Sequence, residues 1–259
     1  MRYKDKTVLI TGSGSGIGKA AALAFAKEGA NLIVSDINDE NGLNTVSEIT
    51  NNKGKATFFK ADVSNYQMVT DLMNFIVEKF GRLDVAINNA GVGGDFAKIT
   101  DLTVESWDKT MSVNSTGVFY CIKNQIPIML KQGGGVILNT SSIAGIRGLP
   151  NATAYSASKH AVIGITKTVA MEYAKNNIRV NAICPVFTVT PMFDPESMDK
   201  LKSGISEKLK ANVPMKRFAN VMEQVSTMLW LCSDEASFIT GQAISVDGCL
   251  LYTSPSPRD

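Results

Sequence analysis

KTVLITGSGSGIGKAAALAFA, at residues 6–26, places a short apolar strand, a glycine-rich turn and a helix in direct succession. Glycine at such a turn permits positive φ angles and lets a ligand approach the backbone closely. The free N–H groups and the positive dipole end of the following helix favour a phosphate group there. The arrangement predicts a dinucleotide-binding βα unit, with phosphate-side contacts at Gly12, Ser15, Gly16, Ile17 and Gly18.

The end of the second predicted strand, where a dinucleotide-binding unit binds the ribose, carries a carboxylate. Asp36 ends the second predicted strand, 18 residues after Gly18, and can accept hydrogen bonds from the adenosine ribose hydroxyls. Alone, the loop also fits an ordinary tight turn, and Asp36 also fits a turn-initiating aspartate. Ser13, Ser15 and the neighbouring contact Ile37 carry no positive charge to neutralise a 2′-phosphate, which Asp36 would repel. We therefore predict NAD(H) in preference to NADP(H).

The rest of the chain alternates short Val/Ile/Leu-rich runs with longer segments of helical apolar spacing. This rhythm predicts an α/β fold, a single doubly wound Rossmann-type parallel sheet with helices on both faces. Strands are expected at 7–11, 31–35, 56–60, 83–88, 136–140, 179–184 and 243–246. Helices are expected at 17–28, 39–51, 66–80, 104–131, 153–175 and 221–232.

No Pro/Ser-rich linker separates these elements, so residues 1–248 are expected to form one catalytic domain. Residues 187–214 break the rhythm with prolines and methionines, which is typical of a mobile lid. Residues 249–259 resemble the translated read-through of a sequencing-library adapter and are predicted to be non-native. A native disordered tail is the alternative.

Composition narrows the class of protein. Of 259 residues, 44% are hydrophobic and 19% charged, which allows one sizeable core. Lys+Arg 26 against Asp+Glu 24, without a basic stripe, argues against nucleic acid or a membrane surface as partner. The longest apolar run, residues 20–26, is too short to span a membrane, and we expect no signal peptide or anchor. Four scattered cysteines favour a reducing cytoplasm.

The single histidine, His160, leaves little room for Ser-His-Asp catalysis or for most zinc sites. We expect it to pack rather than to act, and we expect no metal. Tyr155 and Lys159 lie four residues apart at the start of a predicted helix, so both can face one bound molecule. An ammonium beside a phenol favours the phenolate, and work at neutral pH requires the tyrosine pKa to fall by about 3 units. Alone, such a pair also fits a solvated helix face.

Five motifs in order resemble the short-chain dehydrogenase/reductase family. They are Thr11-Gly12-x-x-x-Gly16-x-Gly18, Asn88-Asn-Ala-Gly91, Asn114, Ser142 and Tyr155-x-x-x-Lys159. The similarity covers residues 3–248. It implies a sheet of order 3-2-1-4-5-6-7 and a homotetramer.

The resemblance also implies a role for each matched residue. Tyr155 is the general acid/base for hydride transfer between a substrate carbon and nicotinamide. Ser142 binds the substrate oxygen, for which its neighbour Ser141 is the less suitable by spacing. Lys159 lowers the tyrosine pKa and binds the nicotinamide ribose, and Asn114 holds a water that links Lys159 to a proton relay.

Further cofactor contacts follow from the same resemblance. Asp62 and Val63 match the adenine contacts, and Asn89, Ala90 and Gly91 match the segment that supports the sheet and touches the adenosine side. Beside the nicotinamide carboxamide stand Pro185, Val186, Thr188 and Thr190. The sequence departs from the family where Val186 replaces a glycine and where Cys249 replaces the second glycine of the closing motif.

We therefore expect an NAD(H)-dependent oxidoreductase that interconverts a secondary alcohol and a ketone. Its specificity is expected to reside in the lid and in Ile143, Ala144, Ile146 and Arg147. The lid residues that line an apolar pocket, or simply fill packing space, are Met192, Phe193, Met198 and Met215. Such a pocket suits cyclic or aromatic alcohols, hydroxysteroids or small diols.

Two alternatives remain open at this point. One is a 3-oxoacyl-thioester reductase that uses NADPH, which residues 233–241 also resemble, although Asp36 argues against NADPH. The other is a non-catalytic dinucleotide sensor that signals through oligomer contacts.

Overall fold

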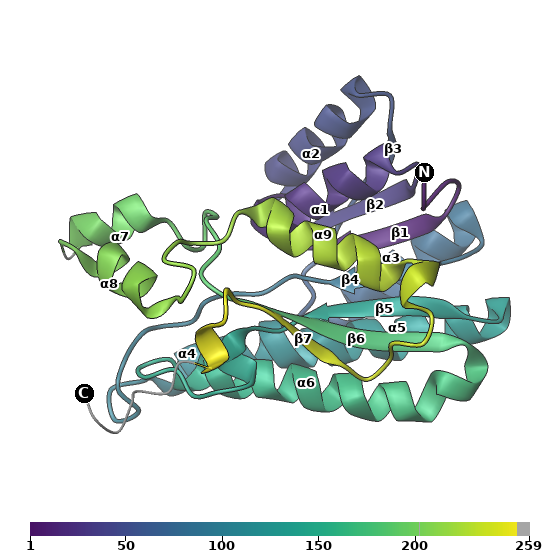
Figure 1. Cartoon of the computed structure of the whole chain (residues 1–259). Helices are drawn as coiled ribbons and strands as arrows, with labels where there is room; N and C mark the ends of the chain where they lie inside the picture. The colour runs from purple at the N-terminus through teal and green to yellow at the C-terminus, as the bar shows by residue number, and fades with distance from the viewer. Residues whose placement is uncertain (202, 253–259) are drawn as a thin grey trace.

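The structure, a computed structural model, describes residues 1–201 and 203–252. Seven parallel strands form one sheet of order β3-β2-β1-β4-β5-β6-β7, which confirms the predicted fold class and strand order (Figure 1). The strands are β1 (Thr7–Thr11), β2 (Asn31–Asp36), β3 (Lys55–Lys60), β4 (Val85–Asn88), β5 (Gly135–Thr140), β6 (Ile178–Pro185) and β7 (Ala243–Val246).

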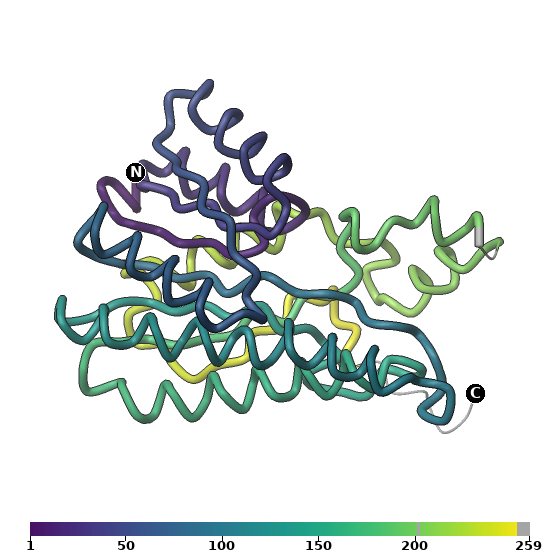
Figure 2. Tube along the Cα trace, turned by 180° about the vertical axis from the view of Figure 1, so that it is seen from behind, coloured from purple at the N-terminus to yellow at the C-terminus, as the bar shows by residue number. Residues whose placement is uncertain are grey.

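Helices cover both faces of the sheet, because a parallel strand between two layers is apolar on both sides. Val8 and Ile10 of β1 pack toward α1 and α9, whereas Leu9 between them packs toward α3, α5 and α6. Figures 1 and 2 show these two layers from opposite sides. The helices are α1 (Gly16–Lys27), α2 (Asp39–Asn51), α3 (Tyr66–Phe80), α4 (Val104–Met111), α5 (Gly117–Gln132), α6 (Thr153–Tyr173), α7 (Pro195–Leu201), α8 (Ile205–Asn212) and α9 (Val221–Cys232).

The strand order places the site. β1 pairs with β2 on one side and with β4 on the other, so consecutive connections leave β1 toward opposite edges of the sheet. Ligands of open α/β sheets bind in the crevice that such a switch point leaves at the carboxyl ends of the strands. The glycine-rich loop after β1 and the segment after β4 therefore stand beside each other.

Helix ends follow local sequence signals. Asn38 and Asn65 cap α2 and α3 by accepting hydrogen bonds from main-chain N–H groups in the first turn. Gly81 ends α3 in the left-handed region, at φ 70°. At α9, Asn220 and Glu223 form a reciprocal capping box. These signals explain why the predicted bounds of α2, α3 and α9 agree with the structure.

The helix expected at 104–131 is confirmed as helical throughout, but it is not a uniform α-helix. A five-residue π-helical turn, Ser112–Thr116, separates α4 from α5. The side chain of Asn114 in this turn bonds both the N–H and the carbonyl of Val92, so the turn is fixed to the segment after β4. The expected helix at 153–175 also ends early, since Asn177 is left-handed at φ 57° after a 3-10 turn.

Residues 187–214 leave the end of the sheet as two short helices, α7 and α8, which stand apart from the main body in Figures 1 and 2. The chain returns through a parallel bridge between Thr188 and Ala219. Of the predicted tail 249–259, Leu250–Tyr252 form a 3-10 turn, and residues 253–259 lie outside the described residues. In the part of the chain that the structure describes, no helix has the length and apolar character needed to cross a bilayer.

Candidate active site

The glycine-rich loop depends on its glycines for close packing. Gly12 has φ 62°, and a Cβ there would lie 2.7 Å from the Cα of Ala90. A Cβ on Gly18 would lie only 2.1 Å from the carbonyl oxygen of Gly12, so α1 begins directly against the loop. Ser15 occupies the N-cap position of α1 in an extended conformation, and its side chain caps no N–H group. The first turn of α1 therefore offers main-chain donors to an anionic ligand, as a pyrophosphate requires.

Asp36 lies at the end of β2 and holds the loop. One carboxylate oxygen accepts from the N–H of Gly14 at 2.8 Å, and the other accepts from the N–H of Asn38 at 2.9 Å. The side chain of Ile37 is exposed beside it. Ser13 instead is buried and bonds the main chain of Ile10 and Ser35, so its role is structural.

The segment after β4 joins the loop to the predicted catalytic group. The Nδ2 of Asn89 donates to the carbonyl oxygens of Thr11 and Gly12, both at 3.1 Å, while Ala90 N–H donates to the Thr11 hydroxyl. A Cβ on Gly91 would lie 3.1 Å from Asn114 Oδ1 and 3.5 Å from Lys159 Nζ. The predicted adenosine-side segment is therefore in contact with both regions.

The predicted adenine contacts follow β3. The Oδ1 of Asp62 accepts hydrogen bonds from the N–H and the hydroxyl of Ser64, at 2.9 and 2.7 Å. Val63 is buried against Gly117, where a Cβ would lie 2.9 Å from the Val63 side chain. Asp62 is partly buried, so its remaining oxygen is available to a ligand, whereas Val63 contributes mainly packing.

Tyr155 and Lys159 share one face of α6, as their spacing predicts. Lys159 is 4% exposed, and its Nζ donates to the carbonyl oxygen of Thr140 at 2.8 Å. This ammonium lies 5.7 Å from the centre of the Tyr155 ring. Burial lowers the pKa of Lys159 to about 8, so the side chain is still mostly protonated at neutral pH.

The protein's own residues raise the pKa of Tyr155, whereas the predicted chemistry requires this pKa to fall. Burial raises this pKa, because a phenolate loses its hydration there, and the hydrogen bond from Ser142 opposes burial only in part. The buried thiol of Cys184 acts in the same direction as burial. The predicted fall therefore requires further positive charge beside the phenol, for which the sequence prediction names the oxidised nicotinamide together with Lys159.

Ser142 and Asn114 reach α6 from two other elements. Ser142 follows β5 in an extended conformation, and its hydroxyl also accepts from the N–H of Ala144 at 3.1 Å. The Nδ2 of Asn114 donates to the Ser158 hydroxyl at 3.1 Å, which in turn donates to the carbonyl of Tyr155 at 2.7 Å. The structure thus brings together the four predicted catalytic residues.

The segment after β6 lies against the same loop. Thr188 is buried, with its hydroxyl bonded to the carbonyl of Val186, and a Cβ on Gly16 would lie 3.5 Å from Thr190. Val186 follows Pro185 without a positive φ, and it packs with Ile143 and Leu250 in a small apolar cluster. Valine is therefore accommodated at this position without left-handed backbone.

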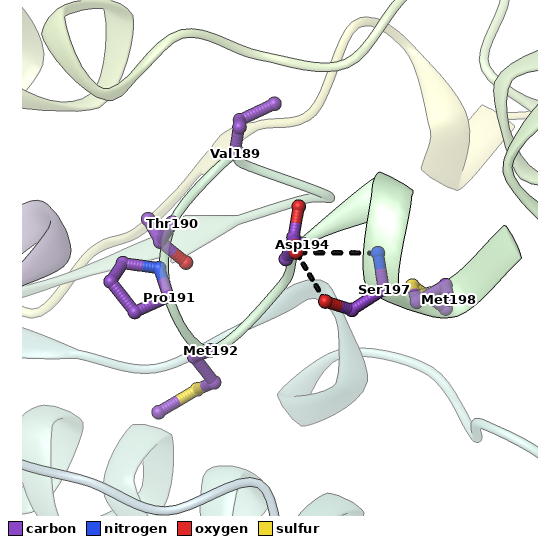
Figure 3. A pocket seen from close by; sticks show the side chains of 7 residues that line it. All are labelled: Val189, Thr190, Pro191, Met192, Asp194, Ser197 and Met198. Atoms are coloured by element: carbon purple, nitrogen blue, oxygen red, sulfur yellow. Dashed lines mark hydrogen bonds between the residues drawn. The ribbon is translucent and has the colours of Figure 1, made fainter. Parts of the chain in front are cut away.

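A cavity of about 450 Å³ opens at the base of the predicted lid (Figure 3). Its lining includes two of the four predicted lid side chains, and the full set is Val189, Thr190, Pro191, Met192, Asp194, Ser197 and Met198. Met215 lines a second, smaller cavity instead, of about 90 Å³.

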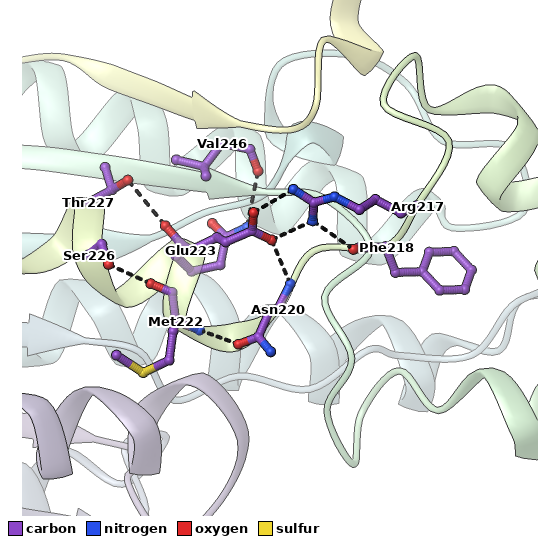
Figure 4. Close-up of polar contacts among 9 residues, drawn as sticks. Arg217, Phe218, Asn220, Met222, Glu223, Ser226, Thr227 and Val246 are labelled. Atoms are coloured by element: carbon purple, nitrogen blue, oxygen red, sulfur yellow. Dashed lines mark hydrogen bonds and ion pairs between the residues drawn. The ribbon is translucent and has the colours of Figure 1, made fainter.

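Phe193 lines neither of these cavities. It stacks on Phe187 at 5.2 Å between ring centres and packs edge-on against Phe218 at 5.1 Å. This aromatic cluster was not predicted, because Phe218 meets Phe187 and Phe193 only in the folded chain. Next to it, Arg217 forms a two-point ion pair with Glu223, at 2.6 and 2.7 Å, where the chain leaves the lid (Figure 4).

His160 is exposed, so the prediction that it packs was wrong. Its Nδ1 lies 2.9 Å from the carbonyl of Ser156 on the outer face of α6. Of the predicted specificity residues, Ile143 and Ala144 are buried beside Ser142, while Ile146 is exposed. Among residues 1–201 and 203–252, no group of three or more His, Cys, Asp or Glu side chains converges as a metal site would require.

Known proteins resemble the chain over nearly its whole length. A family model described as enoyl-(acyl carrier protein) reductase matches residues 12–250. The 3-oxoacyl-acyl-carrier-protein reductase of Thermotoga maritima is 43% identical, over 97% of this chain and 100% of the relative. The 3beta-hydroxysteroid dehydrogenase of Mediterraneibacter gnavus is 40% identical, over 95% of each chain.

Solved structures agree with the fold. Levodione reductase superposes with a TM-score of 0.93 at 34% identity, over 98% of this chain and 100% of that chain. NAD+-bound xylitol dehydrogenase gives 0.91 at 31% identity, over 96% and 100%. Actinorhodin polyketide ketoreductase with NADPH gives 0.90 at 33% identity, over 95% and 97%. Both forms of the nicotinamide dinucleotide therefore occur among the similar structures.

Proposed function

We propose that this chain, which belongs to the short-chain dehydrogenase/reductase family, transfers a hydride between NAD(H) and a secondary alcohol or ketone. The family and the relatives establish an oxidoreductase that interconverts alcohols and ketones with a nicotinamide dinucleotide. The finer assignment to NAD and to individual residues is our proposal. It is supported above all by one observation. The side chain of Asn114 bonds the main chain of Val92, and a Cβ on the neighbouring Gly91 would lie only 3.5 Å from Lys159 Nζ.

The loop fits a dinucleotide. Gly12, Gly16 and Gly18 form a cradle in which side chains would collide or force a left-handed backbone, and the first turn of α1 has no side-chain cap. We propose that these residues hold the pyrophosphate, that Asp36 binds the adenosine ribose, and that Lys159 binds the nicotinamide ribose. When bound, the nicotinamide supplies the hydride acceptor or donor and, in its oxidised form, a positive charge.

The side chains perform the proton chemistry. Ser142 holds the substrate oxygen against the phenol of Tyr155, which takes the hydroxyl proton during oxidation and returns it during reduction. Because burial raises the pKa of Tyr155, the phenolate requires positive charge nearby. Lys159 supplies part of this charge. Hydrogen bonds hold both its main-chain carbonyl and its ammonium group in place. We propose that Asn114 connects this pair to a proton relay.

The preference for NAD is supported by Asp36. Its two oxygens are already bonded to Gly14 and Asn38, so the carboxylate is rigid and charged where a 2′-phosphate would have to stand. The alternative is an NADPH-dependent 3-oxoacyl-thioester reductase, which the Thermotoga maritima relative favours. A higher kcat/KM with NADPH and a 3-oxoacyl thioester than with NAD+ and any alcohol would establish that alternative.

The decisive experiment measures reduced-nicotinamide absorbance for a panel of cyclic and aromatic secondary alcohols, with NAD+ and with NADP+. Tyr155→Phe removes only the phenol oxygen, and we expect a loss of at least about 100-fold in kcat. Tyr173→Phe, the same change at the last residue of α6, is the control and should keep full activity. Equal turnover by wild type and Tyr155→Phe would refute the assigned role and favour a dinucleotide sensor.

Three further parts belong to the same proposal. Residues 187–214 act as a lid over the substrate, with Met192 and Met198 in the wall of its cavity. The protein acts in the cytoplasm as a homotetramer, for which light scattering of the purified chain is the test. The segment 249–259 is a non-native tail, so a chain that ends at Gly248 should keep NAD+ binding.

A further inference from the structure

The last residue of β5 and the residue after it both bond Lys159 of α6. The carbonyl oxygen of Thr140 accepts a hydrogen bond from Lys159 Nζ at 2.8 Å. The hydroxyl of Ser141 donates to the main-chain carbonyl oxygen of Lys159, also at 2.8 Å. Lys159 is therefore held at both ends, the ammonium and the main chain, by two consecutive residues.

The bond between Ser141 and Lys159 is buried. Ser141 is 2% exposed, and its N–H donates to the carbonyl of Ile183 in β6 at 2.8 Å. A Cβ on Gly145 would lie 2.5 Å from the Ser141 hydroxyl oxygen and 2.6 Å from the Lys159 carbonyl oxygen. Glycine at 145 thus allows the 3-10 turn Ile143–Gly145 to close over this bond.

The helix itself does not require this donor. A carbonyl inside an α-helix already accepts the N–H group four residues further along. The added hydroxyl instead fixes the turn of α6 that carries Lys159 against the ends of β5 and β6. We infer that Ser141 is a positioning residue that acts through Lys159. The inference rests on the proposed function, in which Lys159 binds the nicotinamide ribose and favours the Tyr155 phenolate.

Few other titratable groups face this turn. From β6, the buried thiol of Cys184 interacts electrostatically with Lys159, and burial raises the pKa of this thiol to about 11. The carboxylate of Asp247, after β7, also raises the pKa of Cys184. On α6, Tyr155 is the titratable neighbour of Lys159. Because Cys184 is neutral at assay pH, a shift in the pH profile of a Ser141 variant reports on Lys159 and Tyr155.

The test compares Ser141→Ala with Ser156→Ala, each as the full-length protein. Ser156 is a suitable control, because it lies next to Tyr155 on α6 and its buried hydroxyl oxygen has no hydrogen-bond partner in the described structure. Ser141→Ala is also made in a Lys159→Ala background. For each variant we would measure NAD+ affinity by calorimetry, the thermal midpoint, and kcat as a function of pH.

We expect Ser141→Ala to weaken NAD+ binding about three- to tenfold, as the loss of one buried hydrogen bond implies. It should also move the rising limb of the oxidation rate to higher pH, since a misplaced ammonium favours the phenolate less. Ser156→Ala should match wild type in both, and Ser141→Ala should add nothing in the Lys159→Ala background. Thermal midpoints close to wild type would show that the effect is not general destabilisation.

Two results would overturn the inference. One is wild-type NAD+ affinity and pH dependence in Ser141→Ala, and the other is an equal loss of affinity with and without Lys159. If wild type binds NAD+ but oxidises no alcohol, the proposed function fails, while the binding measurements still decide the role of Ser141.

Discussion

Cys249 has a left-handed backbone, and its replacement by glycine should stabilise the protein. The residue has φ 74° and is exposed. Its N–H donates to Asp247 Oδ1 at 3.0 Å, and the N–H of Leu251 donates to the other oxygen of the same carboxylate at 2.8 Å. The turn is therefore fixed by its hydrogen bonds, and a side chain at 249 must accept the unfavourable φ. Glycine accepts this conformation without steric strain.

The expected gain is small but measurable. A left-handed conformation costs an L-residue about 1–2 kcal/mol, while glycine adds about 0.5–1 kcal/mol of unfolded-state entropy. The net gain for Cys249→Gly is about 0.5–1 kcal/mol, because an exposed thiol contributes little packing. With an unfolding entropy of about 2.1 cal/mol/K per residue, a chain of this length should gain about 1–2 °C in Tm.

The assay is thermal unfolding under reducing conditions, with Cys249→Ala as the matched control. Alanine also lacks the thiol but retains the steric penalty, so its Tm should stay within about 0.5 °C of wild type. Equal Tm values for the glycine and alanine variants would refute the argument, since the gain would then come from loss of the thiol rather than from the backbone.

Asp36→Asn keeps a hydrogen-bond acceptor but removes the charge, so the ratio of kcat/KM with NAD+ to kcat/KM with NADP+ should fall about tenfold. An unchanged ratio would mean that Asp36 does not select the cofactor. Burial acts to raise the pKa of Asp84, but the Arg82 hydrogen bond and other contacts outweigh it, so the net pKa lies below the ordinary 3.8. This stabilisation is present above pH 3.8 and is lost as pH falls, so Asp84→Asn should flatten the decline of Tm in acid. Arg179 donates to main-chain carbonyls at the C-terminal end of α9 at 2.8 and 2.9 Å. Arg179→Met should lower the free energy of unfolding in urea by about 2–3 kcal/mol. An unchanged urea midpoint would show that these bonds make no net contribution to stability.

Local patterns determined the sheet and the candidate site. The strand at 7–11 and the glycines after it specify a βα unit because each feature depends on neighbours in sequence: apolar side chains, positive φ angles and free N–H groups. Asp36, Tyr155 and Lys159 were found in the same way, from their spacing to strand and helix ends. The seven strands were correct because the apolar runs alternate with helical segments, and the strand order was correct because the family resemblance implied it.

The tertiary structure decided those contacts and pKa shifts that residue spacing along the chain cannot predict. The π-helical turn at Asn114 interrupts an unbroken helical pattern, because its side chain bonds Val92 across the site. Burial raises the pKa of Tyr155 in the folded chain, since desolvation depends on everything packed around the phenol. The Ser141 bond to Lys159 likewise joins residues 18 positions apart. The sequence by itself predicted which side chains are candidates for proton chemistry. Only packing decided how each is held and how readily it ionises, because burial and contact are properties of the whole fold.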